Sequence, residues 1–292
     1  MEPDDTLLRT ALADLLPVLE EKVRAGGCPL CASCTGGSPT ASSARCEERA
    51  RELLLPLAEY WAARFQEGDP AEVLAGRIDH TLLRPEATPS QVEALCHQAL
   101  QHRFFSVCVN PRYVPLCARL LQGSQVLVCT VAGFPLGATS THAKIEETRQ
   151  ALQDGAKEVD MVLSIGDLKA GNGDRVREEI ARLAEVCHIA GARLKVILET
   201  ALLDDAEKVR GCELAVAAGA DFVKTSTGFA SGGATVYDVL LLRHTVGEKA
   251  GVKAAGGIRT ASDALKMLVA GADRLGTSAG VRLVEEARAW RG

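Results

Sequence analysis

The sequence predicts an α/β protein: a (β/α)₈ (TIM) barrel at residues 71–292 behind an α-helical, cysteine-containing N-terminal extension at residues 1–70. Eight strand-like runs alternate with eight helix-like runs over roughly 215 residues, close to the ~250 residues of such barrels. The composition is 47% hydrophobic but only 4% aromatic, so the core is aliphatic. Aliphatic cores suit helices packed on a parallel sheet.

The predicted strands and helices follow one another in strict alternation. The strand candidates are 77–81, 106–110, 126–131, 158–163, 194–199, 222–226, 251–255 and 274–278. The helix candidates are 90–102, 112–121, 141–154, 174–190, 204–218, 236–250, 261–270 and 281–290. Glycines that can adopt positive φ follow four of these helices, at Gly155, Gly191, Gly219 and Gly271. An open doubly wound sheet is the alternative, but it usually has a glycine-rich turn after its first strand, and here Leu-Leu-Arg-Pro follows.

The extension reads as two helices, at residues 5–24 and 44–65, joined by a loop rich in Gly, Ser, Thr and Cys. Four thiols in and after this loop have a spacing that could hold zinc or an iron–sulfur cluster. They are Cys28, Cys31, Cys34 and Cys46. The alternative is a linker with incidental thiols. The first helix is amphipathic. It resembles peptides that target enzymes to bacterial microcompartment shells, or it docks on the barrel or mediates oligomerisation.

Charge and hydropathy exclude several classes of protein. The net charge of −5 leaves no basic stripe for nucleic acid or a membrane surface. No apolar run approaches the length of a membrane helix, and the acidic start at residues 1–5 is unlike a leader peptide. The ten cysteines do not resemble a secreted disulfide scaffold, so a cytoplasmic location is expected.

Four charged residues stand alone inside predicted strands: Asp160, Lys195, Lys224 and Lys253. Their neighbours in sequence are mostly apolar, and adjacent strand residues point to opposite faces of a sheet. The apolar neighbours therefore fit under the helices, and the charges point into the barrel. A buried charge is costly unless something uses or neutralises it, which favours a catalytic interior.

Lys224 and Lys253 lie on consecutive predicted strands and could be neighbours. A lysine is a nucleophile only when its amine is neutral, and burial or a second cation lowers its pKa. This arrangement predicts Schiff-base chemistry on a carbonyl substrate, with Asp160 relaying protons. The alternative is that the lysines form structural ion pairs with Asp160 and Glu199.

Five segments together resemble the deoxyribose-phosphate aldolase family, from about residue 74 to about residue 286. They are Ile78-Asp-His-Thr-Leu82, Glu158-Val-Asp-Met-Val162, Leu194-Lys-Val-Ile-Leu-Glu-Thr200, Phe222-Val-Lys-Thr-Ser-Thr-Gly-Phe229 and Val252-Lys-Ala-Ala-Gly-Gly-Ile-Arg-Thr260. The resemblance implies a class I aldolase that needs no metal or other cofactor for catalysis. Its substrate would be a small phosphorylated sugar, 2-deoxy-D-ribose 5-phosphate, cleaved to acetaldehyde and glyceraldehyde 3-phosphate. Relatives are often dimers, so a homodimer is expected.

The resemblance also assigns roles to individual residues. Lys224 matches the Schiff-base lysine, Lys253 the second lysine that perturbs its pKa, and Asp160 the carboxylate of the proton relay. Positions that match supporting residues are Asp79, Lys195 and Cys108. For the cysteine, the alternative is a small core residue. A Schiff-base aldolase with a different substrate, and a scaffold or redox-sensing module acting through the N-terminal cysteines, are the competing functions.

Glycine-rich turns after the last three predicted strands predict a phosphate site, because backbone amides at helix N-termini favour anions. The candidates are Thr227, Gly228, Gly256, Gly257, Gly276 and Ser278. Two departures from the family matter. Some relatives carry a lysine where this chain has Phe229, and some extend a tail that ends in tyrosine, whereas this sequence stops at Gly292.

Overall fold

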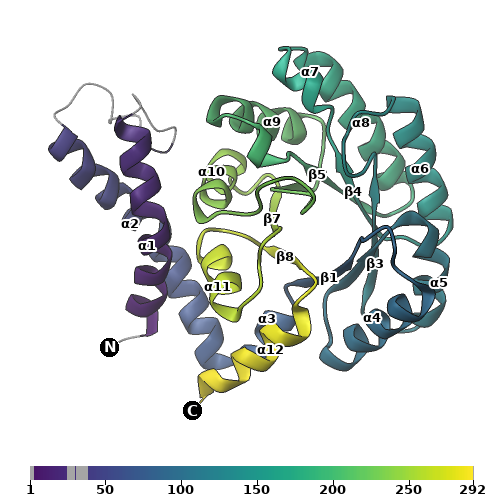
Figure 1. The fold of residues 1–292 in the computed structure, drawn as a ribbon, viewed down its shortest axis with the longest axis horizontal. Coiled ribbons are helices and arrows are strands. Elements are labelled where there is room, and N and C mark those ends of the chain that lie inside the picture. The colour runs from purple at the N-terminus through teal and green to yellow at the C-terminus, as the bar shows by residue number, and fades with distance from the viewer. Residues whose placement is uncertain (1–2, 25–29, 31–38, 292) are drawn as a thin grey trace.

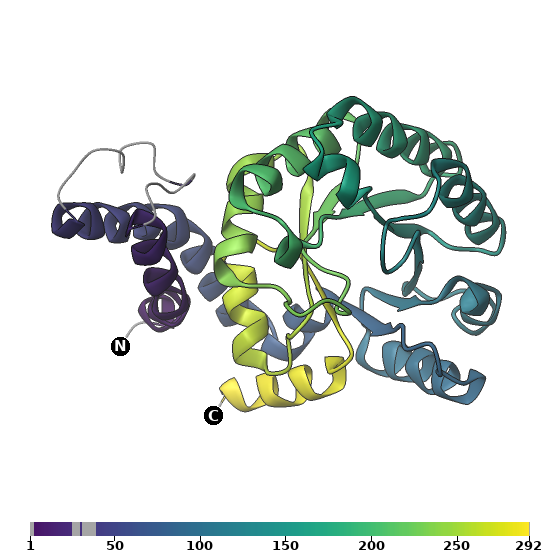
Figure 2. The ribbon, with the colours of Figure 1, turned by 45° about the horizontal axis from the view of Figure 1, so that its top comes forward.

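The computed structural model describes residues 3–24, 30 and 39–291, and its centre is a closed barrel of eight parallel strands (Figures 1 and 2). Each strand pairs with the next in the chain, and β8 pairs with β1. The strands are β1 Ile78–Leu82, β2 Ser106–Val109, β3 Leu127–Ala132, β4 Glu158–Val162, β5 Arg193–Ile197, β6 Phe222–Lys224, β7 Gly251–Ala255 and β8 Arg274–Thr277. The predicted (β/α)₈ barrel is confirmed.

Eight helices cover the outside of the barrel, one after each strand (Figure 2). They are α4 Pro89–His102, α5 Val114–Leu120, α6 Thr141–Gln153, α8 Gly173–Ile189, α9 Asp205–Ala217, α10 Val236–Val246, α11 Ala261–Val269 and α12 Gly280–Arg288. The four glycines expected to end helices all have positive φ, from +66° to +109°. Thr88 and Thr260 accept hydrogen bonds as capping-box residues at the starts of α4 and α11.

Several boundaries differ from the sequence prediction by a few residues, and three differences are larger or unexpected. The strand β6 ends at Lys224, where residues up to 226 were expected, although the Thr225 backbone amide still donates to the Lys253 carbonyl of β7. The helix α10 ends at Val246, before Gly247 with its positive φ. Two short helices were not predicted, α3 Pro70–Ala75 and α7 Ile165–Lys169, since neither is long enough to show a helical period.

The predicted alternation of side chains in the strands is confirmed. The charged residues Asp160 and Lys195 are paired in register and are fully buried, as are their apolar neighbours. Burial of both faces is what a parallel sheet wrapped by helices requires. The apolar neighbours pack under the helices, and the charged side chains point into the interior of the barrel.

The helices of the extension, α1 Pro3–Arg24 and α2 Pro39–Glu67, pack against each other and against the side of the barrel formed by α10 and α11 (Figure 1). The apolar stripe of α1, including Leu12, Leu15 and Leu19, is almost completely buried. In α2 the Trp61 Nε1 donates a buried 3.0 Å hydrogen bond to the Leu268 carbonyl of α11. Of the alternatives for the first helix, docking on the barrel is therefore the one that α1 follows, since its apolar face is already covered within this chain.

Of the four candidate N-terminal ligands, Cys46 is buried inside α2. Cys28, Cys31 and Cys34 lie outside the described residues. A metal or cluster on this set stays a prediction. Among the described residues, no helix is both long and apolar enough to cross a membrane.

Candidate active site

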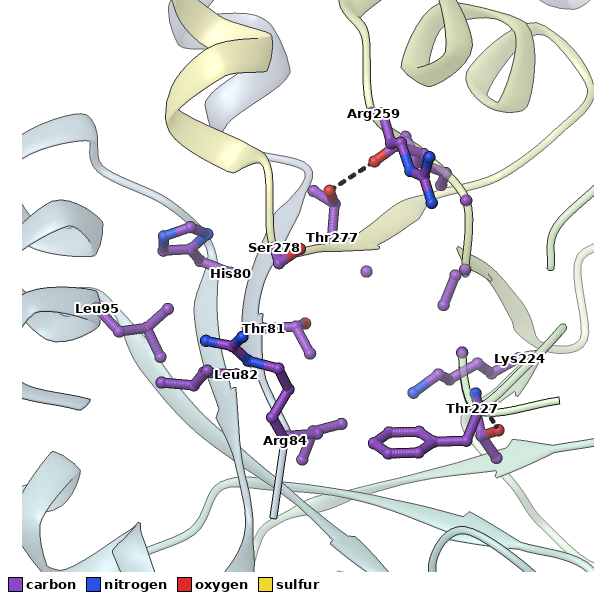
Figure 3. Close-up of a pocket in the computed structure, with 18 of the residues that line it drawn as sticks. His80, Thr81, Leu82, Arg84, Leu95, Lys224, Thr227, Arg259, Thr277 and Ser278 are labelled. Atoms are coloured by element: carbon purple, nitrogen blue, oxygen red, sulfur yellow. Dashed lines mark hydrogen bonds between the residues drawn. The ribbon is translucent and has the colours of Figure 1, made fainter. Parts of the chain in front are cut away.

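A pocket of about 650 Å³ opens at the carboxyl ends of the strands (Figure 3). Active sites of (β/α)₈ barrels lie at this end. All six residues predicted for the phosphate site line it: Thr227, Gly228, Gly256, Gly257, Gly276 and Ser278. They come from the segments after β6 and β7 and from the end of β8, so the closed barrel brings together residues that are about 50 positions apart in the sequence.

Lys224 connects this pocket to the interior of the barrel. It is the last residue of β6 and lines the pocket, yet only 2% of its surface is exposed. Figure 3 shows its side chain extending from the strand toward the middle of the pocket. Its Nζ lies 2.9 Å from Asp160 Oδ2, which holds the amine in one position. A carbonyl compound in the pocket could therefore reach this amine.

Lys253 lies directly beside Lys224, because the two residues are register partners on β7 and β6. The prediction that these lysines are neighbours is confirmed. Lys253 is fully buried, and its Nζ lies 2.7 Å from Asp160 Oδ2 and 2.6 Å from Asp79 Oδ2. The contact with Asp79 is an ion pair without hydrogen-bond geometry. Burial lowers the pKa of Lys253, but the two carboxylates outweigh burial and raise it well above its ordinary value.

Asp160 is the centre of the site. Lys195, another predicted supporting residue, reaches the second oxygen, Oδ1, at 3.0 Å. Burial alone raises the pKa of Asp160, but the neighbouring side chains of Lys195, Lys224 and Lys253 hold it well below its ordinary value. Asp160 is therefore a permanent carboxylate at neutral pH, with a cation on each side.

The ion-pair alternative is correct in part. The lysines do pair with Asp160, but Glu199 accepts hydrogen bonds from the Thr227 backbone amide and hydroxyl. Glu199 has a positive φ of 59°, a conformation rare for a non-glycine residue. These contacts fix the start of the loop that carries Thr227 and Gly228 into the pocket.

Cys108 lies on β2 in register with Cys129 on β3, and both are fully buried. The Cys129 thiol donates to Asp160 Oδ1 at 3.2 Å, and burial holds the pKa of this thiol well above its ordinary value. The two thiols and Asp160 offer atoms within 4.8 Å of one another. The cationic Lys195 and Lys253 on Asp160 would oppose a metal ion there.

Sequence reasoning missed four functional candidates. Arg84 and Arg259 line the pocket. Both lie in segments that were used in the sequence analysis, but no role was predicted for either arginine. Their signal in the sequence was a cation in the loop after a strand: Arg84 immediately precedes Pro85, and Arg259 lies two residues after the Gly256-Gly257 pair. Glu158 and Arg274 are buried inside the barrel as ion-pair partners of each other. Each is the first residue of its strand, a position that usually reaches solvent.

Comparison with known proteins agrees with this geometry. The family model described as "DeoC/LacD family aldolase" matches residues 74–283. The deoxyribose-phosphate aldolase of Desulfitobacterium hafniense is 54% identical over 211 residues, which are 72% of this chain and 97% of the relative. That of Thermococcus gammatolerans is 55% identical over 217 residues, 74% of this chain and 96% of the relative.

Among solved structures, the deoxyribose phosphate aldolase of Aeropyrum pernix, described as a unique tetramer, has a TM-score of 0.72 at 34% identity. The match covers 81% of this chain and 97% of that one. A closed barrel whose pocket is lined by a nearly buried lysine agrees with membership of a family of aldolases, which are lyases. The chain belongs to the DeoC/LacD family of aldolases, and within it the similar relatives named above are deoxyribose-phosphate aldolases.

Proposed function

We propose that this protein is a class I aldolase that reversibly cleaves 2-deoxy-D-ribose 5-phosphate to acetaldehyde and D-glyceraldehyde 3-phosphate through a Schiff base on Lys224. One observation carries the proposal: of the buried lysines around Asp160, Lys224 is the one that lines the pocket. Lys195 and Lys253 are completely buried beneath it. The names of the relatives supply the substrate.

The chemistry follows from the position of the amine. Neutral Lys224 attacks the aldehyde carbon of the open-chain sugar, and loss of water gives an iminium ion. A base removes the proton of the C3 hydroxyl, the C2–C3 bond breaks, and its electrons pass to the iminium as an enamine. Glyceraldehyde 3-phosphate leaves, the enamine carbon takes a proton, and hydrolysis releases acetaldehyde and the free amine. Asp160, 2.9 Å from the amine, is placed to relay protons in the steps that form and break the imine.

Arginines strengthen the case for a phosphorylated substrate. The replacement of a family lysine by Phe229 removes one cation from the pocket, but Arg84 and Arg259 line the same pocket. Arg259 follows Gly256 and Gly257 and immediately precedes Thr260, which caps the N-terminus of α11. A guanidinium beside glycine amides at a helix N-terminus is a good phosphate site. This combination favours the phosphorylated sugar over the alternative of an unphosphorylated acceptor.

Turnover tests the proposal directly. Purified protein should release glyceraldehyde 3-phosphate and acetaldehyde in equal amounts from 2-deoxyribose 5-phosphate, measured by coupled reduction of each aldehyde. Unphosphorylated 2-deoxyribose should be cleaved with a lower kcat/KM. Equal kcat/KM values for the two sugars would favour the alternative, a Schiff-base aldolase with a different substrate. If neither sugar were cleaved, the proposal would be contradicted.

The remaining expectations concern the rest of the molecule. A homodimer, a cytoplasmic location and the division of the chain at residue 70 stay predictions. Zinc or an iron–sulfur cluster on Cys28, Cys31, Cys34 and Cys46 also stays a prediction, and a role as a redox-sensing module depends on it. Metal analysis of anaerobically purified protein tests it, and less than a stoichiometric amount of iron or zinc would exclude it.

A further inference from the structure

Six buried charged side chains form a closed loop of ion pairs inside the barrel, which we call the charge ring. In order around the loop they are Asp160, Lys253, Asp79, Arg274, Glu158 and Lys195. The members come from β1, β4, β5, β7 and β8. Their side chains are 0 to 3% exposed. Every member touches two others of opposite charge.

The half of the ring next to the pocket consists of Asp160, Lys253 and Asp79, whose contacts are described above. Lys224 is attached to this half through Asp160 but is not a member of the ring. Lys253 therefore has two carboxylate partners, whereas the partner that Lys224 has in the ring is Asp160, which it shares with two other lysines.

The other half of the ring lies toward the amino ends of the strands. Arg274 donates to Asp79 Oδ1 through Nε at 2.9 Å and also through Nη2. It binds both oxygens of Glu158, at 2.9 and 3.2 Å. Glu158 Oε2 then lies 2.6 Å from Lys195, which closes the loop. The Arg274 guanidinium also lies 3.3 Å from the centroid of the Phe105 ring.

The charges of the ring cancel. Three carboxylates and three cations sum to zero, as long as each keeps its ordinary charge. The ion pairs favour these charges: burial opposes them, but the opposite charges hold the pKa of Asp79 low and those of Lys195 and Arg274 high. A proton on Lys224 would therefore add one positive charge that the ring does not balance, in a region of low dielectric constant.

The other polar groups that face the interior from β2 and β3 are one hydroxyl and two thiols, those of Ser106, Cys108 and Cys129. The hydrogen bond between the two thiols lowers the pKa of Cys108, and burial holds that of Cys129 well above its ordinary value. Glu199, on the loop after β5, is engaged with Thr227. The permanent charges that face Lys224 from the described strands are thus those of the ring, on β1, β4, β5, β7 and β8.

Stability alone does not explain such a ring. Buried ion pairs are often no more stabilising than apolar residues of similar volume, because removing the charges from water is costly. Glu158 and Arg274 begin β4 and β8, at the ends of the strands away from the pocket, so contact with the substrate does not explain them either.

We propose that Glu158 and Arg274 are positioning residues that fix the net charge of the ring at zero and thereby keep the Lys224 amine unprotonated and nucleophilic. The inference rests on the proposed function, since it assumes that Lys224 is the nucleophile. In this proposal the whole ring, and not Lys253 alone, controls the charge of Lys224, because the charge of Lys253 is itself compensated by two carboxylates.

Two substitutions test the proposal because they change the interior charge in opposite directions. Glu158→Gln removes a negative charge, which disfavours protonated Lys224, so the acid limb of the pH profile of kcat/KM should move to lower pH. Arg274→Met removes a positive charge, which favours protonated Lys224, so the acid limb should move to higher pH. Each shift should be about 1 pH unit, as expected for a unit charge about 10 Å away at an effective dielectric constant of about 20.

Matched variants separate charge from packing. The double variant Glu158→Gln/Arg274→Met is again neutral and should return the acid limb to the wild-type pH, even if its kcat stays low. Arg274→Lys keeps the charge and should leave the limb in place. Should Arg274→Met not fold, Lys195→Met removes the same charge from the other side of Glu158 and should move the limb in the same direction.

The pH dependence of borohydride trapping of acetaldehyde on Lys224 gives a second reading of the same ionisation. The proposal would be overturned if the acid limb of the pH profile did not shift in either single variant, or shifted in the same direction in both. Either result would leave the aldolase function intact. Failure of the aldolase function itself would instead appear as a wild-type protein that neither turns over nor is trapped.

Discussion

Lys224 and Lys253 bind the same carboxylate oxygen, Asp160 Oδ2, at 2.9 and 2.7 Å. Two amines on one acceptor cannot both be stabilised as strongly as either one alone. Lys253 has a second carboxylate partner in Asp79, whereas in the ring Lys224 contacts Asp160 alone. This asymmetry distinguishes the nucleophile from its neighbour, although both are register partners in the same sheet.

Removing the shared acceptor should damage both folding and catalysis. Asp160→Asn leaves three buried lysines short of a negative charge, and we expect the free energy of unfolding to fall by about 3–5 kcal/mol. The kcat/KM should fall by at least about 100-fold, because the proton relay is lost. Urea unfolding and steady-state kinetics measure the two effects. Asp174→Asn, at a 99% exposed side chain, is the control and should change the free energy of unfolding by less than about 0.5 kcal/mol.

The depressed pKa values of Asp79 and Asp160 make a prediction about acid. A carboxylate whose pKa is lower in the folded than in the unfolded state contributes stability that is fully present above its ordinary pKa of about 4. The contribution is lost as the pH falls through the folded-state pKa, because the unfolded chain binds more protons. Urea unfolding at pH 7, 5 and 3 should therefore show little change from these groups until the last step. Asp79→Asn should decline less between pH 5 and 3, and an equal decline would contradict this assignment.

Comparing a phosphorylated with an unphosphorylated substrate separates effects on phosphate binding from effects on the reaction at the carbonyl carbon. Arg259→Gln should raise KM for 2-deoxyribose 5-phosphate about tenfold, the effect of losing one charge-assisted hydrogen bond. The same variant should leave kcat/KM for unphosphorylated 2-deoxyribose nearly unchanged. Arg119→Gln, at an exposed residue of α5, is the matched control. A loss of equal size on both substrates would show that Arg259 does not contact the phosphate.

The N-terminal helices should stabilise the barrel without entering the chemistry. Trp61→Phe keeps an aromatic ring but removes the indole donor to the Leu268 carbonyl, which keeps its hydrogen bond from the Gly271 amide, and should cost about 1 kcal/mol of stability. Thermal unfolding measures this loss, and kcat at 25 °C should not change. Tyr60→Phe, at a neighbouring residue that is 48% exposed, should leave the melting temperature close to that of the wild type. A Trp61→Phe protein as stable as Tyr60→Phe would mean that the contact is not formed in solution.

Much of the site was predictable because strand order and alternation of side chains decide it. Two lysines on consecutive parallel strands, each flanked by apolar residues, have few places to lie other than side by side inside the barrel. Glu158 and Arg274 could not be predicted, since a charge at the start of a strand normally reaches solvent. Here the two meet across the closed barrel, 116 residues apart in the chain.

The contact between the extension and the barrel could not be predicted from the sequence either. The amphipathic pattern of α1 predicts a buried face but not the surface that covers it. Trp61 binds a carbonyl 207 residues further along the chain, and no local pattern encodes such a partner. The short helices α3 and α7 were not predicted for a local reason. Five or six residues are too few to show the periodicity by which a helix is identified.

Covalent trapping with acetaldehyde tests the central claim most directly. Sodium borohydride added to the folded protein with acetaldehyde should reduce an imine and leave a two-carbon adduct, which peptide mass spectrometry assigns to Lys224. Lys224→Met protein, shown to be folded by circular dichroism, should take up no adduct at this site. An intact, folded wild-type protein that carries its adduct on Lys253 or Lys195, or takes up none, would contradict the account.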